Sequence, residues 1–293
     1  MNAPGYERRT QNSDLRTSNR NSEHEPGTRN PELQVLGSGT DLLSSMTHTI
    51  KLTVAYDGTR FVGWQRQADG VSIQGLLEDA LARLEGGPVT VHGAGRTDAG
   101  VHALGQVASA QVTSAHPVDV VARALNACLP PEIRVTGVEQ AADDFHARFS
   151  ARSKTYRYAI RNAPIVSPFE RAYVWHVPDR LDREAMRQGA AALVGTHDFA
   201  AFRSTGSEVK DTTRTITQSE FVVSEEATRL VYEITADGFL RHMVRAIVGT
   251  LVETGRGQRP AASIPALLAG GSRAEAGATA PPQGLFLVRV DYD

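Results

Sequence analysis

The sequence predicts an α+β protein with two similar domains, each built on a mostly antiparallel sheet with helices on one face. Two observations support this fold class. Strands and helices alternate along the chain, but several strands follow one another directly, which is typical of antiparallel meanders rather than of a doubly wound parallel sheet. The two halves also have similar strand and helix content, with a boundary expected near residues 162–168. The sheet face without helices would be free to hold a ligand.

The first segment of the chain differs in composition from the rest. Residues 1–46 are polar, rich in Asn, Ser, Arg, Glu, Gly and Pro, and show no sustained periodicity. Such a segment cannot bury enough apolar surface to offset the entropy that it loses on ordering. We therefore expect a disordered N-terminal extension. A start codon chosen too far upstream is the alternative explanation of the same residues.

The N-terminal domain is expected at residues 47–162, where local patterns predict each element. Apolar residues alternate in the first strand and recur along one face of the first helix, which begins at the N-cap residue Ser72 and ends at Gly86. Cys128 lies in an apolar helical run, where a small buried residue is expected. Strands are expected at 47–56, 89–91, 106–112, 133–138 and 155–161, and helices at 72–84 and 120–128.

The C-terminal domain is expected at residues 163–293. It shows the same two periods, one of two residues for strands and one of 3.6 residues for helices. Strands are expected at 214–223, 230–236 and 285–290, and helices at 183–194, 242–254 and 264–268.

Composition excludes several classes of protein. Of 293 residues, 41% are apolar and 22% are charged, which excludes collagen-like, coiled-coil and mainly disordered chains. No apolar run reaches the roughly 18 residues that a membrane span needs, and we expect no secretory signal because no apolar segment follows the charges of the first residues. The single cysteine excludes an intramolecular disulfide and a zinc site built from cysteines. We expect a cytoplasmic protein.

Charge is concentrated in one part of the chain. The net charge of −2 does not suggest a polyanionic partner, but a local basic patch attracts phosphate whatever the total. Basic residues interleave with aromatic ones between positions 148 and 161, without a single acidic residue, as in a sheet that faces RNA. The basic residues are Arg148, Arg152, Lys154, Arg157 and Arg161, and the aromatic ones are Phe149, Tyr156 and Tyr158. Arg241 and Arg245, four apart on a predicted helix, would point at one phosphate track, although ordinary solubility explains them equally well.

A glycine-rich loop follows the second predicted strand. Residues 93–102 read Gly-Ala-Gly-Arg-Thr-Asp-Ala-Gly-Val-His, and the glycines permit unusual backbone angles and close approach of another group. Arg96 and Asp98 are two residues apart and face each other only if the backbone bends sharply. Taken alone, such a loop is more often a surface turn in which the aspartate binds a backbone amide.

Several motifs in a fixed order overturn that interpretation. Residues 95–102 match the signature of the TruA family of tRNA pseudouridine synthases. Further segments resemble the same family in the same order, namely 55–59 with 63–67, 154–158, 195–199, 239–245 and 280–287. The resemblance runs from about residue 49 to the C-terminus. It implies the pseudouridine synthase fold, with an RNA-binding cleft between the two domains.

The resemblance also implies that Asp98 is the catalytic nucleophile. It would attack a uridine of tRNA, at the base or at the ribose C1′. The glycosidic bond would then break, and the uracil would turn and rejoin through C5 with loss of the C5 proton. Substrate and product have the same formula, so no cofactor and no metal are expected. A nucleophilic carboxylate must be ionised, which the guanidinium of Arg96 would favour as the predicted partner of Asp98. Arg96 would also contact the flipped nucleotide.

The target uridine must leave its stack before it can react. Flipping costs on the order of a few kcal/mol, and an aromatic ring returns roughly 1–3 kcal/mol per stacked base. The resemblance assigns this ring to Tyr156 and an apolar contact with the same base to Leu285; a tyrosine that packs in the core is the alternative for Tyr156. The other candidate substrate-binding residues are Arg152, Lys154, Arg157, Arg241 and Arg245. The resemblance further implies a homodimer that binds the tRNA anticodon stem-loop at positions 38, 39 and 40.

Two other functions remain open. A hydrolase or phosphotransferase could use Asp98, but phosphoryl transfer normally needs a bound divalent ion and further carboxylates, and no Asp-x-Asp pair accompanies Asp98. A non-catalytic RNA-binding protein would need the basic and aromatic residues but has no use for an Arg-x-Asp pair. His197, Asp198 and His242 lack a second ligand at the spacing of a metal site and are expected to be structural.

Overall fold

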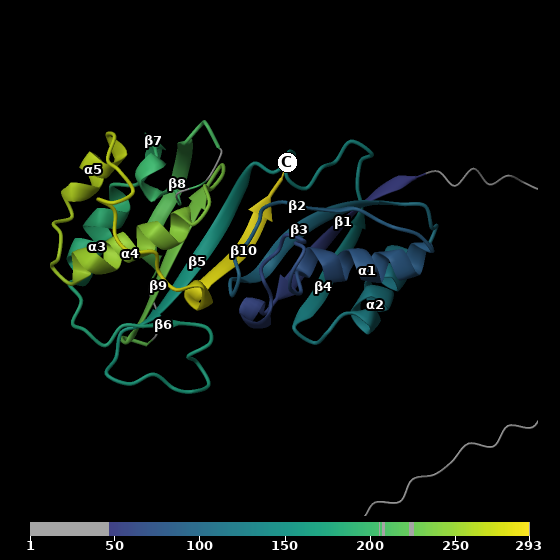
Figure 1. Cartoon of the computed structure of the whole chain (residues 1–293), viewed down its shortest axis with the longest axis horizontal. Helices are drawn as coiled ribbons and strands as arrows, with labels where there is room; N and C mark the ends of the chain where they lie inside the picture. Colours follow the sequence, from purple (N-terminus) through teal and green to yellow (C-terminus); the bar gives the residue numbers. More distant parts are fainter. Residues whose placement is uncertain (1–46, 205, 207–208, 223–225, 293) are drawn as a thin grey trace, which may run out of the picture. The chain divides into compact units, whose positions relative to one another are not determined.

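The computed structural model describes residues 47–292 except 205, 207–208 and 223–225, so the predicted extension at residues 1–46 lies outside the described residues. Within this range ten strands form one sheet (Figure 1). The strands are β1 (His48–Tyr56), β2 (Val91–Gly93), β3 (His102–Val112), β4 (Ile133–Gln140), β5 (Ser153–Arg161), β6 (Trp175–His176), β7 (Gly195–Asp198), β8 (Thr213–Val222), β9 (Arg229–Ala236) and β10 (Leu285–Asp291). The α-helices are α1 (Ile73–Glu85), α2 (Val118–Cys128), α3 (Arg183–Ala191), α4 (Met243–Gly255) and α5 (Ser263–Leu268). Short 3-10 helices are η1 (Gly58–Arg60), η2 (Ala200–Phe202) and η3 (Pro282–Gly284).

The strand order brings the end of the chain to the middle of the sheet. The order is β4-β1-β3-β10-β5-β9-β8-β7, with β2 paired to β3 and β6 paired to β5. All of these pairs are antiparallel except β10 with β3 and β6 with β5. The prediction of an α+β fold with a mostly antiparallel sheet is therefore confirmed. The predicted halves share this one sheet, and their division into two domains at residue 162 stays a prediction.

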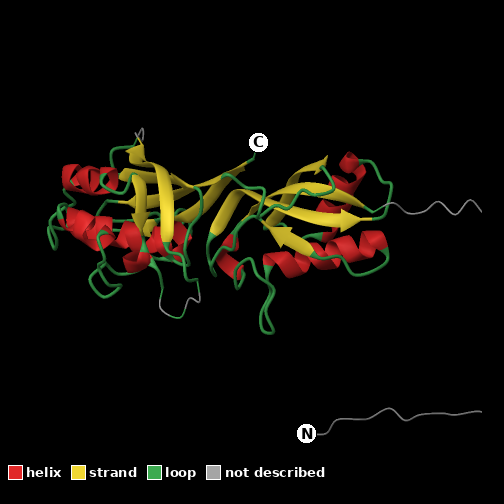
Figure 2. Cartoon of the chain, turned by 90° about the horizontal axis from the view of Figure 1, so that it is seen from above, coloured by secondary structure: helices red, strands yellow, loops and turns green. Residues whose placement is uncertain are grey.

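The helices pack against the sheet in two groups. α1 and α2 lie toward one end of the sheet and α3, α4 and α5 toward the other, with β5 and β10 between them (Figure 1). Figure 2 shows most of the helices on one side of the strands. Buried apolar side chains of the sheet and the helices form a core that extends from Leu52 and Leu77 to Tyr232 and Leu251. Among the helices that the structure describes, none is long and apolar enough to cross a membrane.

Local signals predict the first helix well. The Ser72 side chain accepts a hydrogen bond from the Gly75 N–H, and Gly86 ends α1 in the left-handed region at φ 73°. Other boundaries differ by a few residues: β2 covers 91–93 rather than 89–91, and α3 ends at 191 rather than 194. β3 begins at His102 rather than at 106 because its first residues pair with β10, which is far away in the sequence.

Cys128 is exposed, which corrects the expectation of a buried cysteine. It is the last residue of α2, where the helix presents Val121 and Leu125 to the core. The next position at this four-residue spacing is Leu129, which is buried in its turn. Cys128 therefore lies just outside the apolar face.

Candidate active site around Asp98

The loop between β2 and β3 carries Asp98, and its backbone is held from two sides. The Trp64 N–H donates to the Thr97 carbonyl at 3.0 Å. The side-chain nitrogen of Gln106, on β3, donates to the Gly95 carbonyl at 2.8 Å. These bonds satisfy the polar backbone of an irregular segment and limit its conformations.

Two glycines let neighbouring segments approach this loop closely. A side chain at Gly63, where φ is 107°, would lie 2.6 Å from the Thr97 carbonyl oxygen, and one at Gly58 would lie 1.9 Å from the Val101 carbonyl oxygen. No residue with a Cβ fits at such distances. Both glycines belong to the motifs that resemble the TruA family, so these motifs support the Asp98 loop through backbone contact.

The Asp98 carboxylate has two basic neighbours at the beginning of α4. Arg245 Nη1 donates to Asp98 Oδ2 at 2.9 Å, and His242 Nε2 lies 3.5 Å from Oδ1. The Arg245 side chain is 14% exposed and that of Asp98 is 26% exposed, so the pair is shielded while the carboxylate stays accessible. Arg245 Nε also donates to the Ala280 carbonyl at 2.8 Å, which orients the guanidinium.

Arg96 does not pair with Asp98 in this structure. Its side chain is exposed, and it has no ion pair in the part of the chain that the structure describes. Thr97, between the two, is buried, and its hydroxyl is 2.8 Å from the Tyr56 hydroxyl, so Arg96 and Asp98 flank a residue that is fixed in the core. Arg245 takes the place predicted for Arg96. The role of Arg96 toward the nucleotide stays a prediction.

His242 is a residue that the sequence analysis assigned only to structure. Its φ of 62° is the only positive value at a non-glycine position among the described residues, and such strained backbone clusters at functional sites. Burial lowers the pKa of His242 and the nearby guanidiniums of Arg241, Arg245 and Arg273 lower it further, whereas Asp98 opposes them. The imidazole is therefore neutral near pH 7. The sequence signal that could have identified His242 as a site residue is its three-residue spacing from Arg245, which places both side chains on the same turn of a helix.

The two arginines predicted to follow one phosphate track have different surroundings. Arg245 is bonded to Asp98 and Ala280, as described, and is largely buried. Arg241 is exposed just before α4 and close enough to His242 to affect its pKa. Of these two arginines, Arg241 is the one that can meet a phosphate without breaking an ion pair formed within the described residues.

Tyr156 lies in the core and also borders the Asp98 loop. It is 6% exposed, and its ring meets that of Phe239 edge to face at a centroid distance of 5.0 Å. A side chain at Gly95 would lie 4.0 Å from the Tyr156 hydroxyl. Burial raises the pKa of Tyr156, and the neighbouring Tyr56 and Asp98 raise it further, so the phenol is protonated. Its hydroxyl has no hydrogen-bond partner in the described residues, although a buried tyrosine hydroxyl usually finds one.

Lys154 and Leu285 lie near Tyr156. The Lys154 Cε and Cδ atoms would be 3.5 and 3.6 Å from a side chain at Gly95. Burial lowers the pKa of Lys154, and Arg148 lowers it further. Leu285 begins β10 opposite Tyr158 and is 5% exposed. The structure thus brings Lys154 and Tyr156 to the Asp98 loop, and Leu285 to the strand beside them.

Arg157 and Arg152 lie elsewhere. Arg157 faces the other side of β5, where its Nε and Nη2 donate to Glu233 Oε1 on β9 at 2.8 and 2.7 Å. Arg161 follows on the same side and is paired with Glu170 and Glu226. Arg152 is exposed just before β5 and its N–H donates to the Asp291 carbonyl at 2.9 Å. The structure therefore does not bring Arg157 together with Lys154 and Tyr156.

The residues considered as metal ligands make local contacts. Asp198 Oδ1 accepts from the Ala200 N–H at 2.9 Å, and His197 Nε2 lies 3.0 Å from the Val194 carbonyl. Within the described residues no three His, Cys, Asp or Glu side chains come close enough to hold a metal ion.

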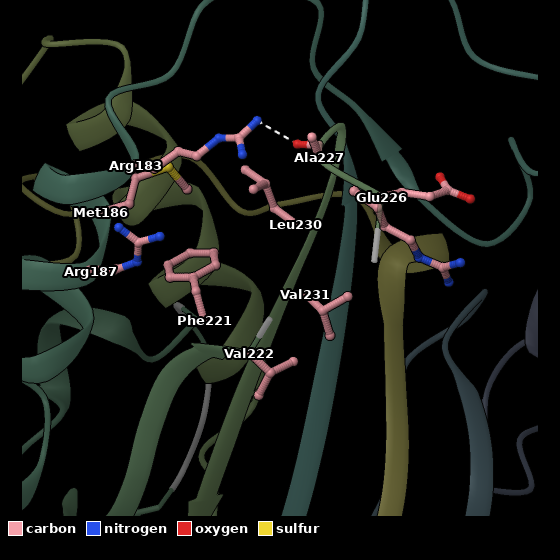
Figure 3. Close-up of a pocket in the computed structure, with 10 residues that line it drawn as sticks. Arg183, Met186, Arg187, Phe221, Val222, Glu226, Ala227, Leu230 and Val231 are labelled. Carbon is pink, nitrogen blue, oxygen red and sulfur yellow. Dashed lines mark hydrogen bonds between the residues drawn. The ribbon is translucent and has the colours of Figure 1, made fainter. Parts of the chain in front are cut away.

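A cavity of about 260 Å³ lies between α3 and the adjoining ends of β8 and β9 (Figure 3). Its walls combine arginines with apolar side chains, among them Arg183, Met186 and Leu230, and Arg183 donates to the Ala227 carbonyl. None of the predicted site residues lines this cavity. It is a feature separate from the surroundings of Asp98.

Comparison with known proteins relates these features to a family. A family model described as tRNA pseudouridine synthase matches residues 52–150 and 190–293, which include Asp98 and Arg245. The chain is 48% identical over 244 residues to tRNA pseudouridine synthase A of Syntrophotalea carbinolica, covering 83% of the chain and 96% of that protein. It is 48% identical over 243 residues to the protein of the same name from Myxococcus xanthus, covering 83% and 91%. A third relative of that name, from Geotalea uraniireducens, is 44% identical over 243 residues, covering 83% and 99%.

Proposed function

Since this chain belongs to the family of tRNA pseudouridine synthases and is therefore an isomerase of uridine in tRNA, we propose that Asp98 is its catalytic residue and that its target uridines lie in the anticodon stem-loop. One observation supports Asp98 above the others. Its carboxylate is partly exposed and is bonded by Arg245, 147 residues away in the sequence, whose guanidinium is itself held by Ala280.

The ion pair suits a carboxylate that must act as a nucleophile. Arg245 binds Oδ2 and orients the carboxylate, which leaves Oδ1 for attack on the base or on the ribose C1′. The N1–C1′ bond of the uridine breaks, the uracil turns, and a C5–C1′ bond forms as the carboxylate is released. C5 then loses its proton and N1 takes up one proton. Atoms balance without a co-reactant because uridine and pseudouridine are isomers.

Tyr156 provides a surface for the flipped base. Stacking on one ring returns roughly 1–3 kcal/mol, which offsets much of the cost of unstacking, on the order of a few kcal/mol. The hydroxyl that has no partner among the described residues is available to the substrate. Because burial raises the pKa of Tyr156, its hydroxyl keeps its proton and can donate a hydrogen bond to the uracil.

Three cations around the loop support an RNA substrate. Arg96, Lys154 and Arg241 have no ion pair within the described residues, whereas the guanidinium bonded to Asp98 is already committed. Free cations next to a reactive carboxylate would bind the phosphates on either side of the target nucleotide.

The test of this proposal is Asp98→Asn. The variant should bind tRNA as the wild type does and lose pseudouridine formation by at least about a thousandfold, because the amide is not a nucleophile. Asp69→Asn is a matched control at an exposed aspartate outside the site, and it should keep full activity. Pseudouridine formation by the Asp98 variant at an undiminished rate would contradict the assignment. A wild-type protein that binds tRNA without converting it would indicate a binding protein instead.

The position of the target and the assembly are proposed from the resemblance of the ordered motifs. We expect modification at positions 38, 39 and 40 by a cytoplasmic homodimer whose tRNA spans both subunits. Mapping pseudouridine in tRNA from cells that lack the gene tests the positions, and loss at other positions alone would contradict them. Sedimentation of the purified protein tests the assembly, since a dimer has twice the chain mass of 31.6 kDa.

A further inference from the structure

Three aromatic rings form a row beside the Asp98 loop, in which the first and third residues are exposed and the middle one is half-buried. The ring centroids of His92 and His146 are 4.8 Å apart, and those of His146 and Phe149 are 4.4 Å apart, with tilts of 32° and 37°. Phe149 is 76% exposed, and the guanidinium carbon of Arg148 lies 5.5 Å from its ring centroid. We call His92, His146 and Phe149 the ring ladder. An exposed apolar ring with a cationic neighbour is a surface that a partner can cover.

The turn that carries the ring ladder is held in place. His146 Nδ1 accepts the backbone N–H groups of the second and third residues after it, at 3.1 and 3.4 Å. Ala147, which directly follows His146, is fully buried. Its N–H donates to Ser109 Oγ at 3.0 Å, and its carbonyl accepts from the Tyr292 hydroxyl at 2.7 Å. The turn is thus bonded to β3 and to the residue that follows β10. A ligand would pay little ordering entropy on binding to it.

The ring ladder lies close to the active site along the chain. His92 lies in β2 shortly before the Asp98 loop, and the intervening chain spans at most about 20 Å. A strand of at most roughly six stacked nucleotides, at about 3.4 Å each, would span that upper limit. Arg148 is near enough to Lys154 to affect its pKa, and Lys154 borders Gly95. Basic side chains therefore connect the ring ladder to the proposed position of the target nucleotide.

We propose that the ring ladder is a second base-binding site, where an unpaired base of the tRNA stacks on Phe149 while Arg148 binds the adjoining phosphate. The inference depends on the proposed function, because that function supplies an RNA strand at Asp98. Stacking on an aromatic ring accepts any base, since every base has a π-face, and a loop offers bases that can be splayed out. The adjacent arginine and lysine favour a nucleic acid over a protein as the occupant.

Binding measurements on Phe149 variants test the proposal. The full-length protein with Asp98→Asn serves as background, because it should bind tRNA without converting it. At fixed ionic strength, Phe149→Ala should weaken binding of a tRNA transcript about tenfold, as expected for one lost stack. Phe149→Leu, which is apolar but has no ring, should lose a similar amount, and Phe149→Trp should lose nothing. If the alanine or leucine variant bound tRNA as tightly as the background protein does, the proposal would be overturned.

Phe169→Ala is the matched control. Phe169 is 90% exposed, more than Phe149, and no ring or cation contact of its side chain occurs among the described residues. The control should bind tRNA as the background protein does. If Phe149→Ala instead changes the oligomeric state in sedimentation while Phe169→Ala does not, the ring ladder is a protein contact and the proposal fails.

Abasic substitutions in the tRNA identify the bound base. At one unpaired position, removal of the base should weaken binding to the protein with Phe149 but should not weaken binding to the Phe149→Ala variant further. Such coupling is expected of two groups in contact. Additive effects at every position would overturn the proposal. Because these assays measure binding alone, their failure leaves the role of Asp98 untouched. That role fails only if the Asp98→Asn variant still forms pseudouridine.

Discussion

The two sides of strand β5 carry similar residues but differ in what those residues bind. On the side of the Asp98 loop, Lys154 and Tyr156 have no ion pair and no side-chain hydrogen bond within the described residues. On the other side, Arg157 is bonded to Glu233 on the neighbouring strand at 2.8 Å, and Arg161 is paired with two glutamates. Lys154 and Tyr156 thus keep their polar groups available to a substrate, whereas the hydroxyl of Tyr158 on the same side is bonded to the Pro281 carbonyl.

This difference shows that charge along a strand does not by itself indicate an RNA-binding surface. Successive side chains of a strand point to opposite faces, so a basic run is divided between two environments. An arginine that faces a glutamate in register is neutralised and serves the sheet, as Arg157 does. Four predictions, ordered from the largest expected effect to the smallest, concern this part of the molecule.

Arg245→Met should have the largest effect. It keeps the length of the side chain but removes the guanidinium from Asp98 and from the Ala280 carbonyl, so the single-turnover rate of pseudouridine formation should fall about 100- to 1000-fold. Unfolding free energy should fall by about 1–3 kcal/mol, because a shielded carboxylate is left without its partner. Arg256→Met, which removes an arginine paired with Asp179 at the other end of α4, is the control and should keep the rate. A wild-type rate for the Arg245 variant would mean that the ion pair serves only the fold.

Tyr156→Phe should have the next largest effect. The ring and its stacking remain, so tRNA affinity should not change, whereas loss of the hydroxyl should slow turnover about 100-fold. Stability should not fall, because this hydroxyl has no partner in the described residues. In Tyr232→Phe, the lost hydroxyl is bonded to Ser219 at 2.7 Å, so stability should fall by about 1 kcal/mol while turnover stays normal. Rapid-quench kinetics measure the turnover of the two variants, and thermal unfolding measures their stability. If both variants lost the same turnover and the same stability, the hydroxyl of Tyr156 would have no special role in the reaction.

Lys154→Ala and Arg157→Ala compare the two sides of β5 directly. The lysine variant should bind tRNA several-fold more weakly and reduce the slope of log affinity against log salt by about one, because one phosphate contact is lost. The arginine variant should leave both quantities unchanged and lower stability by less than about 1 kcal/mol, since the Arg157–Glu233 pair is partly exposed. Titration at several salt concentrations measures both. Equal losses in the two variants would show that both faces meet RNA.

His102, at the end of the Asp98 loop, should give the smallest effect. It is 1% exposed, and its Nδ1 accepts the Gly58 N–H at 3.1 Å. Burial lowers the pKa of His102 below its usual 6.5, and Asp57 opposes this. The unfolded chain then binds the proton more readily, so stability is full above about pH 6.5 and falls as the pH drops toward the lower folded-state pKa.

Thermal unfolding at pH 7.5 and 5.5 measures this dependence. His102→Asn keeps an acceptor for the Gly58 N–H but cannot titrate, so its melting temperature should depend less on pH than that of the wild type. His116→Asn, at an exposed histidine, should show the wild-type dependence. An unchanged pH dependence in the His102 variant would mean that other groups, including His242, account for the whole effect.

Local signals made much of the fold predictable. Ser72 and Gly86 mark the ends of α1 because capping depends on residues within one turn. The glycine-rich loop and its aspartate could be found from the sequence because the motif is contiguous. The exposed position of Cys128 was missed because an apolar run does not by itself show which of its residues meet the core, and here the core takes Val121, Leu125 and Leu129.

The sequence by itself determined the fold class, the family and the position of Asp98, because each of these depends on periodicity or on contiguous motifs. Only the tertiary structure decided that Arg245 rather than Arg96 binds Asp98, that His242 lies beside it, and that β10 enters the sheet between β3 and β5. These contacts join residues far apart in the chain, and their partners are selected by the packing of α4 and β10 against the rest of the sheet. No local pattern of residues encodes such a choice.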